Sequence, residues 1–219
     1  MSTTADPERR LETPRAAGVA GLAFAALFIG SILLLRNNPS GASTAAEIRR
    51  FYLGEHADRV SLVGVYLAPF SGIAFLWFIA VLRNLIGDRE DRFFATVFLA
   101  SGLLFVAMLF IAAGVGGAVL AAVKFQDEPV PSDDAVVLVR SFAFGFLFIY
   151  AMRMAAVFMI VVSTIGMRLG VFPRWLVVTG YLAALVLILN VSYAALLTLV
   201  FPAWVAAVSV VILRADRTA

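Results

Sequence analysis

The sequence predicts an all-α fold: a polytopic transmembrane helix bundle with six spans, both termini cytoplasmic, and a short amphipathic helix in the first outer loop. Of the 219 residues, 63% are apolar and 14% are charged, whereas a soluble domain is typically about 45–50% apolar and about 25% charged. The mean hydropathy is +0.99. The charged residues fall outside the long apolar runs except for Arg140 and Arg153, as a bilayer requires, because a charge in hydrocarbon is costly.

Each predicted span is an apolar run long enough for the roughly 30 Å hydrocarbon layer, which a helix crosses in about 20 residues. A last uncharged run at residues 175–213 is too long for one crossing, so we divide it near Asn190-Val191-Ser192. The third and fourth runs are expected to tilt or to project beyond the lipid. The predicted spans are residues 16–35, 60–82, 93–123, 136–167, 175–190 and 194–213, with five or seven spans as alternatives.

These spans form one predicted membrane domain at residues 16–214, between a cytoplasmic leader at 1–15 and a cytoplasmic tail at 215–219. The first span is interpreted as a retained anchor, because its uncharged core of 20 residues exceeds the about 7–15 of a secretory signal. The small residues at 41–45 resemble a cleavage site and support the alternative of a removed signal.

Positive charges predict the orientation, since cytoplasmic loops are enriched in lysine and arginine. Ten basic residues lie on the side of the termini and five on the other side, so both termini are predicted to be cytoplasmic. The ratio of sixteen arginines to one lysine is typical of GC-rich coding and favours a bacterial plasma membrane, that is, a multi-pass protein of the cell membrane.

The outer loops carry two helix-start patterns. Residues 44–47, Thr-Ala-Ala-Glu, fit a capping box, and the amphipathic helix that follows is interpreted as a cap over the bundle or, alternatively, a lid over a cavity. Its apolar residues stand at helical spacing: Ile48, Phe51 and Tyr52. His56 is interpreted as solvated, with a pH sensor as the alternative. In the acidic third connection, interpreted as a solvated linker rather than a calcium loop, Ser132 is predicted to cap the next helix.

Two kinds of residue inside the spans bear on packing. Pro69 and Pro202 are expected to kink their helices, because proline removes an amide donor. Since Ser71 and Gly72 follow Pro69, the carbonyl freed near Val65 is predicted to face a polar cavity. Small residues at helical spacing predict close helix packing: Gly21 and Ala25, Ala26 and Gly30, Ala113, Gly117 and Ala121, and Gly114, Ala118 and Ala122.

Arg153 is the residue that points most directly to a function. It lies near the middle of the fourth span, where an arginine costs about 2.5–3.5 kcal/mol, and no acidic residue lies in any predicted span. It is predicted to interact with backbone carbonyls, water, an external anion, or a polar side chain; the side chains are Tyr66, Tyr150, Asn190 and Tyr193. The predicted site is an aromatic pocket for a lipid phosphate or a carboxylate, and its residues are Arg153, Tyr150, Phe146, Tyr66 and Asn190. The alternative is a structural arginine bonded to kinked backbone, and Arg140 is expected to snorkel to the outer headgroups.

The residue inventory predicts no catalytic residue, no metal site and no cofactor. There is no cysteine and one histidine, which disfavours zinc, thiolate and bis-histidine chemistry. The predicted spans hold no carboxylate that would act as acid, base or proton carrier, and no basic aromatic patch indicates nucleic acid. The chain is therefore predicted not to be an enzyme.

Three segments resemble a family of actinobacterial multi-pass integral membrane proteins of unknown function. They are Glu47–Tyr52, Phe75–Arg83, and Phe172–Leu176 followed by Gly180. The resemblance implies the fold and supplies no active site. Independently of it, Pro173 suits a helix start and Trp175 an interfacial anchor.

The functional hypothesis from sequence is a lipid- or small organic anion-binding, transport-like bundle with a buried arginine. Its expected partners are membrane lipid and a small anionic ligand. The alternative is an accessory or regulatory subunit that packs against another membrane protein through its small-residue faces. Nucleic acid is not an expected partner.

Overall fold

The structure is a computed structural model that describes residues 13–35, 44, 46–47, 50, 54, 62–86, 92–126, 128–129, 131–190 and 195–217. Within these ranges the chain forms helices and no strand, so the predicted all-α fold is confirmed. In chain order the elements are α1 (Thr13–Leu34), the π-helix η1 (Leu62–Leu67), α4 (Ala68–Ile86), α5 (Arg92–Phe125), α6 (Asp133–Phe144), the π-helix η3 (Gly145–Ala151), α7 (Met152–Leu169), α8 (Arg174–Leu189), α9 (Ala195–Thr198) and α10 (Val200–Arg217).

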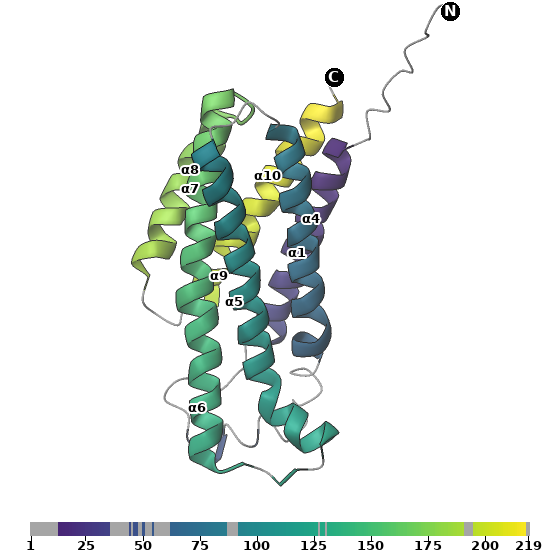
Figure 1. Ribbon diagram of the computed structural model, residues 1–219, viewed down its shortest axis with the longest axis vertical. Helices are drawn as coiled ribbons and strands as arrows, with labels where there is room; N and C mark the ends of the chain where they lie inside the picture. The colour runs from purple at the N-terminus through teal and green to yellow at the C-terminus, as the bar shows by residue number, and fades with distance from the viewer. Residues whose placement is uncertain are drawn as a thin grey trace, which may run out of the picture.

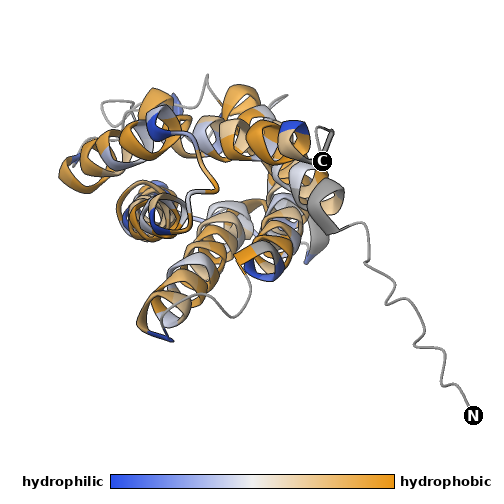
Figure 2. Cartoon of the chain, turned by 90° about the horizontal axis from the view of Figure 1, so that it is seen from above, coloured by the Kyte–Doolittle hydropathy of each residue, from blue (hydrophilic) through white to orange (hydrophobic). Residues whose placement is uncertain are grey.

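Among the described residues, four helices are long and apolar enough to cross a membrane, by length and composition: Leu62–Asn84, Arg92–Val123, Asp133–Leu169 and Leu196–Ala215. Two shorter apolar helices accompany them, Gly18–Leu34 and Arg174–Leu189. Apolar residues surround most of each helix and hydrophilic residues gather at helix ends (Figure 2). A helix that is apolar all round is typical of a membrane protein.

The helices differ in length, and this shapes the bundle. At 1.5 Å per residue, the 37 residues of Asp133–Leu169 extend about 55 Å, against about 24 Å for the 16 residues of α8. Figure 1 shows α5 and α6 reaching below the other helices, whereas α8 ends part-way down beside α7. The start of α1 and the end of α10 lie at the same, upper end. The α5–α6 end therefore has fewer helices around it than the upper end.

The core is a cluster of phenylalanines where α1, α4, α5, α7 and α10 meet. Phe75 is fully buried, and its ring centroid lies 4.7 Å from that of Phe24, 5.1 Å from Phe105 and 5.2 Å from Phe158. Edge-to-face and tilted ring pairs of this kind add to the energy of apolar burial. The rings thus join five helices in one core.

The small-residue faces have different outcomes. A Cβ on Gly21 would collide with Ser209 and Phe78, and Ala25 is buried, so this predicted face packs closely on its neighbours. Gly114 and Ala118 are instead exposed on the outside of α5. The face of Gly114 and Ala118 therefore does not pack against another helix among the described residues.

Both predicted helix-start patterns in the loops, at residues 44–47 and at Ser132, are confirmed. The Thr44 amide donates to Glu47 Oε2 at 2.9 Å, and the Glu47 amide donates to Thr44 Oγ at 3.3 Å. The Ala135 amide donates to Ser132 Oγ at 3.4 Å at the start of α6. The apolar side of the amphipathic helix and His56 lie outside the described residues.

Both prolines lie at irregular points within longer helical segments, Leu62–Asn84 and Leu196–Ala215. Pro69 is the second residue of α4, directly after η1, and Pro202 is in the first turn of α10, after a break between Thr198 and Val200. The interruption at Leu199 lies one turn before Pro202, whose missing amide removes the usual helical donor to the carbonyl four residues earlier. The kink expected at Pro202 stays a prediction. At Pro69 the chain changes from π- to α-helix.

Candidate functional site

A partly open cavity of about 100 Å³ lies between α1, η1 and the start of α4, α5, and the α6–η3 segment. Much of its wall consists of glycine and alanine, with Gly64, Ala68, Ala113 and Gly117 among the lining residues. A Cβ on Gly117 would meet nothing within 4 Å. The four helical segments stand apart here because the side chains between them are too small to fill the space.

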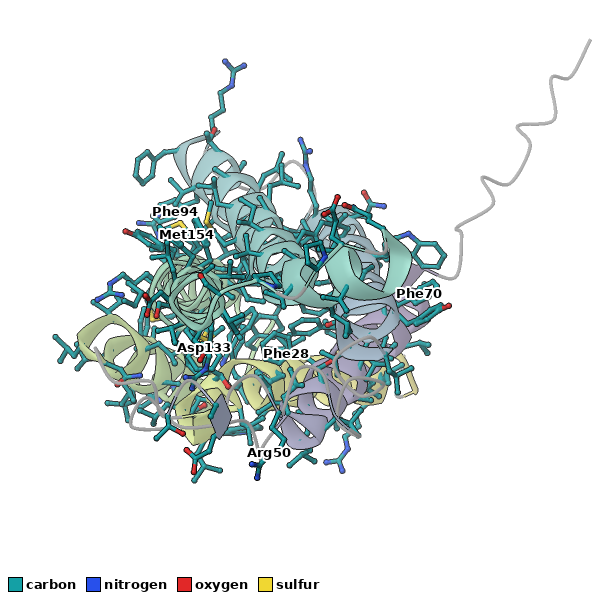
Figure 3. The ribbon with its side chains drawn as sticks, turned by 90° about the horizontal axis from the view of Figure 1, so that it is seen from below. Phe28, Arg50, Phe70, Phe94, Asp133 and Met154 are labelled. Carbon is teal, nitrogen blue, oxygen red and sulfur yellow. The ribbon has the colours of Figure 1, made fainter. Side chains whose placement is uncertain are left out.

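The cavity separates two apolar clusters. Phe28 and Leu109 belong to the large aromatic core and also line the cavity, whereas Leu35 lines it and packs on the small cluster of Val119, Leu120 and Val136. Seen from the lower end of the bundle, Phe28 points to the centre and Phe70 points outward (Figure 3). The cavity is thus an interruption in the core at the α5–α6 end.

Two serine hydroxyls line this mainly apolar wall. Ser31 Oγ donates to the Leu27 carbonyl at 2.8 Å. Ser71 is 1% exposed, and its Oγ has no hydrogen-bond partner among the described residues. The cavity adjoins the segment where we expected one from Pro69, but the wall is apolar rather than polar.

A positive charge lies behind one wall of the cavity. Arg140 is 6% exposed, and its guanidinium carbon lies 4.7 Å from the centroid of Phe144, whose side chain lines the cavity. Arg140 is therefore packed against its own helix rather than extended from the surface of the bundle, and its level in a membrane stays a prediction. Its guanidinium lies on an aromatic face, which a weakly hydrated planar cation favours.

Arg153 lies in the first turn of α7, directly after η3. Its Nη1 donates to the Ile149 carbonyl at 3.0 Å, and the same carbonyl accepts the Met152 amide. The side chain is half-buried and does not line the cavity. This geometry matches the structural alternative considered for Arg153.

The other predicted site residues are distributed along the bundle. The rings of Phe146 and Tyr150 lie 6.0 Å apart on one helix, but Tyr150 and Tyr66 are 56% and 55% exposed. Asn190 ends α8, where its amide donates to the Val186 carbonyl. None of the five predicted residues, all of which the structure describes, lines the cavity. Tyr193 lies outside the described residues.

Helix register nevertheless brings Asn190 to the level of Arg153. Helices α7 and α8 run antiparallel, and the hydroxyls of Thr164 and Tyr181 lie 2.8 Å apart. From this pair, going back along α7 toward its start and forward along α8 toward its end moves in the same direction in space. The end of α8 therefore lies opposite the start of α7. The pairing of Asn190 with Arg153 stays a prediction, and the sequence did not predict the location of the cavity.

Comparisons with known proteins found no family model, no curated protein and no solved structure that matches this chain. The resemblance to actinobacterial membrane proteins consequently stays a prediction, and the site is interpreted from its own chemistry.

The cavity offers three interactions to a ligand. Its small apolar residues provide contact surface, Ser71 provides a hydroxyl that can donate or accept, and Arg140 provides positive charge beyond the Phe144 ring. Among the described residues no group of histidine, cysteine, aspartate and glutamate could hold a metal ion. The arrangement suits an amphiphile with an apolar chain.

Proposed function

We propose that this protein is a lipid-binding membrane protein, and that the cavity between α1, α4, α5 and α6 receives part of an acyl chain. The observation that carries the proposal is the cavity of about 100 Å³ with a wall of small apolar residues. A cavity of about 150 Å³ lined by Leu, Ile and Phe binds benzene, so this volume suits a short piece of hydrocarbon.

The proposed topology has six spans in a bacterial plasma membrane, with the upper end of Figure 1 facing the cytoplasm. Basic residues at that end support it: Arg83 lies in the last turn of α4, and Arg168 lies over the Phe94 ring at 4.5 Å. Ser71 precedes Arg83 by twelve residues, about 18 Å along a helix. The cavity then lies in the half of the bundle nearer the outer leaflet.

The lipid in this proposal carries a negative headgroup. Arg140 precedes Arg168 by 28 residues, about 40 Å along the helix, which brings it to the outer headgroup level on this topology. A chain in the cavity would pass Phe144 and leave an anionic headgroup near the guanidinium. Arg153 is assigned the structural role that its bond to Ile149 supports.

The experiment introduces a larger side chain on one wall of the cavity, so that the side chain occupies the space proposed for the lipid. Gly117 and Gly114 both lie in α5, and a Cβ on either meets nothing within 4 Å, but only Gly117 lines the cavity. Gly117→Leu should therefore reduce the lipid retained by the purified protein in native mass spectrometry about ten-fold, a change of about 1.4 kcal/mol. Gly114→Leu is the matched control and should retain lipid as the wild type does. Equal retention by the two variants would contradict the proposal.

A second candidate function is an accessory subunit of another membrane complex. The exposed Gly114 and Ala118 would let a partner helix approach α5 closely. Gly114→Leu then separates the two candidates, because it blocks this face without entering the cavity. A partner lost from mild-detergent purification of Gly114→Leu, but kept by Gly117→Leu, would favour the subunit.

A further inference from the structure

The Ser71 hydroxyl departs from the pattern of the other helical hydroxyls. Most of these donate to the carbonyl four residues earlier, which satisfies them inside an apolar helix. The residues that do so are Ser31, Thr96, Ser101, Ser141, Thr164 and Ser209. Ser71 lies near the start of α4, one turn beyond the π-helix η1, and in the described structure its Oγ makes no such bond.

Ser71 lies in a closely packed part of the cavity wall. The neighbouring Gly72 packs so closely on α5 that a Cβ there would collide with Phe110, and Ser71 itself is 1% exposed. Ser71 also lines the cavity. A buried hydroxyl without a partner is unfavourable, so a molecule in the cavity that brings a polar atom gains a hydrogen bond there.

Ser163 shows that this argument is specific to Ser71. Its Oγ is also buried without a partner in the part of the chain that the structure describes. However, α8 packs directly against it, since a Cβ on Gly180 would collide with the Ser163 hydroxyl and approach Trp204. Ser163 does not line the cavity, so no ligand reaches it.

Resting on the proposed function, we infer that the ligand is an amphiphile whose acyl chain carries an oxygen atom part-way along, and that Ser71 hydrogen-bonds to it. Ser71 lies about 18 Å along the helix from the basic end of α4 and therefore within the roughly 30 Å hydrocarbon layer. Headgroup and ester oxygens lie outside that layer. The polar atom must consequently belong to the chain, as in a hydroxylated or keto acyl chain.

The test compares two probes that differ by one hydroxyl, stearate and a mid-chain hydroxystearate, by displacement of a fluorescent fatty acid from the full-length protein in nanodiscs. The wild type should prefer the hydroxylated probe about five-fold, the value of one net hydrogen bond. Ser71→Ala should abolish the preference and bind stearate at least as well as the wild type. Ser31→Ala is the matched control and should keep the preference, because its hydroxyl is bonded to the Leu27 carbonyl.

The outcomes separate the two proposals. Equal affinities for both probes in the wild type would mean that water satisfies Ser71, and a preference that survives in Ser71→Ala would place the recognition elsewhere; either result overturns this inference alone. Binding of neither probe would overturn the proposed function together with it. Native mass spectrometry of lipids co-purified from the host membrane then distinguishes a hydroxylated phospholipid from a free hydroxy fatty acid.

Discussion

The pairing of Arg140 with Phe144 makes a quantitative prediction about the wall of the cavity. The two side chains are one helical turn apart, and the guanidinium carbon lies 4.7 Å from the ring centroid. Arg140→Gln removes the charge and keeps much of the stem, whereas Phe144→Leu removes the ring and keeps an apolar side chain. Because Phe144 also lines the cavity, the single variants report several effects at once, and only a double-mutant cycle isolates the pair.

The expected coupling follows from burial. A cation over an aromatic face contributes about 0.5–1 kcal/mol at exposed sites and about 2 kcal/mol when desolvated. Arg140 is 6% exposed, so we expect about 2 kcal/mol. Arg168 and Phe94 provide an internal control, since their separation is 4.5 Å but Arg168 is exposed. Their coupling should lie nearer to about 0.5 kcal/mol.

The assay is SDS-induced unfolding in mixed micelles, followed by far-UV circular dichroism, for both sets of single and double variants. The Arg140–Phe144 coupling should exceed the Arg168–Phe94 coupling about four-fold, the ratio of the desolvated to the exposed value. A coupling at Arg140–Phe144 below about 0.5 kcal/mol, within the additivity of independent sites, would refute the reasoning that burial strengthens this contact.

Two further predictions concern charge and close packing. Arg153→Met should leave lipid retention in native mass spectrometry unchanged, because the guanidinium bonds to the Ile149 carbonyl and does not line the cavity; loss of lipid would restore Arg153 to the binding site. Gly21→Val should lower the free energy of unfolding by about 1–3 kcal/mol, because its Cβ would collide with Ser209 and Phe78. Gly114→Ala, by contrast, should raise it by about 1 kcal/mol through helix propensity, and the same SDS titration measures both. If Gly21→Val and Gly114→Ala changed the free energy of unfolding in the same direction, the packing argument would be contradicted.

Features that depend on a few consecutive residues were predictable from the sequence. The capping box at residues 44–47 and the Ser132 cap each need only side chains within one turn. The end of α8 at Leu189 lies beside the predicted division at Asn190, because a polar residue interrupts a long apolar run. Existence and approximate ends of the helices follow from such local contrasts in composition.

Which face of each helix is buried was not predictable. In α4 the adjacent aromatic residues Trp77 and Phe78 are 68% and 0% exposed. In a soluble helix the exposed position would be polar and would mark the face. Lipid is as apolar as the core, so this contrast is missing, and the sequence does not distinguish lipid-facing from core-facing positions.

The cavity and the position of Arg140 were missed for a related reason. The cavity wall combines small residues from four segments that are distant in sequence, and no local pattern indicates where those segments stand apart. Only the Pro69 and Ser71 pattern pointed to this region. Arg140 was considered without its neighbours on the helix and was therefore expected to reach the headgroups. Phe144 lies four residues further along the same helix, a spacing that favours side-chain contact and could have predicted this pair.

The two arginines inside the predicted spans are accommodated by groups on their own helix. At η3 the Ile149 carbonyl accepts both the Met152 amide and the Arg153 guanidinium, and Arg140 lies on Phe144. The arrangement at Arg153 needs no acidic side chain. It follows that the main energy for holding an amphiphile would come from apolar contact in the cavity and the Ser71 hydroxyl, while Arg140 would contribute to the choice between anionic and zwitterionic headgroups.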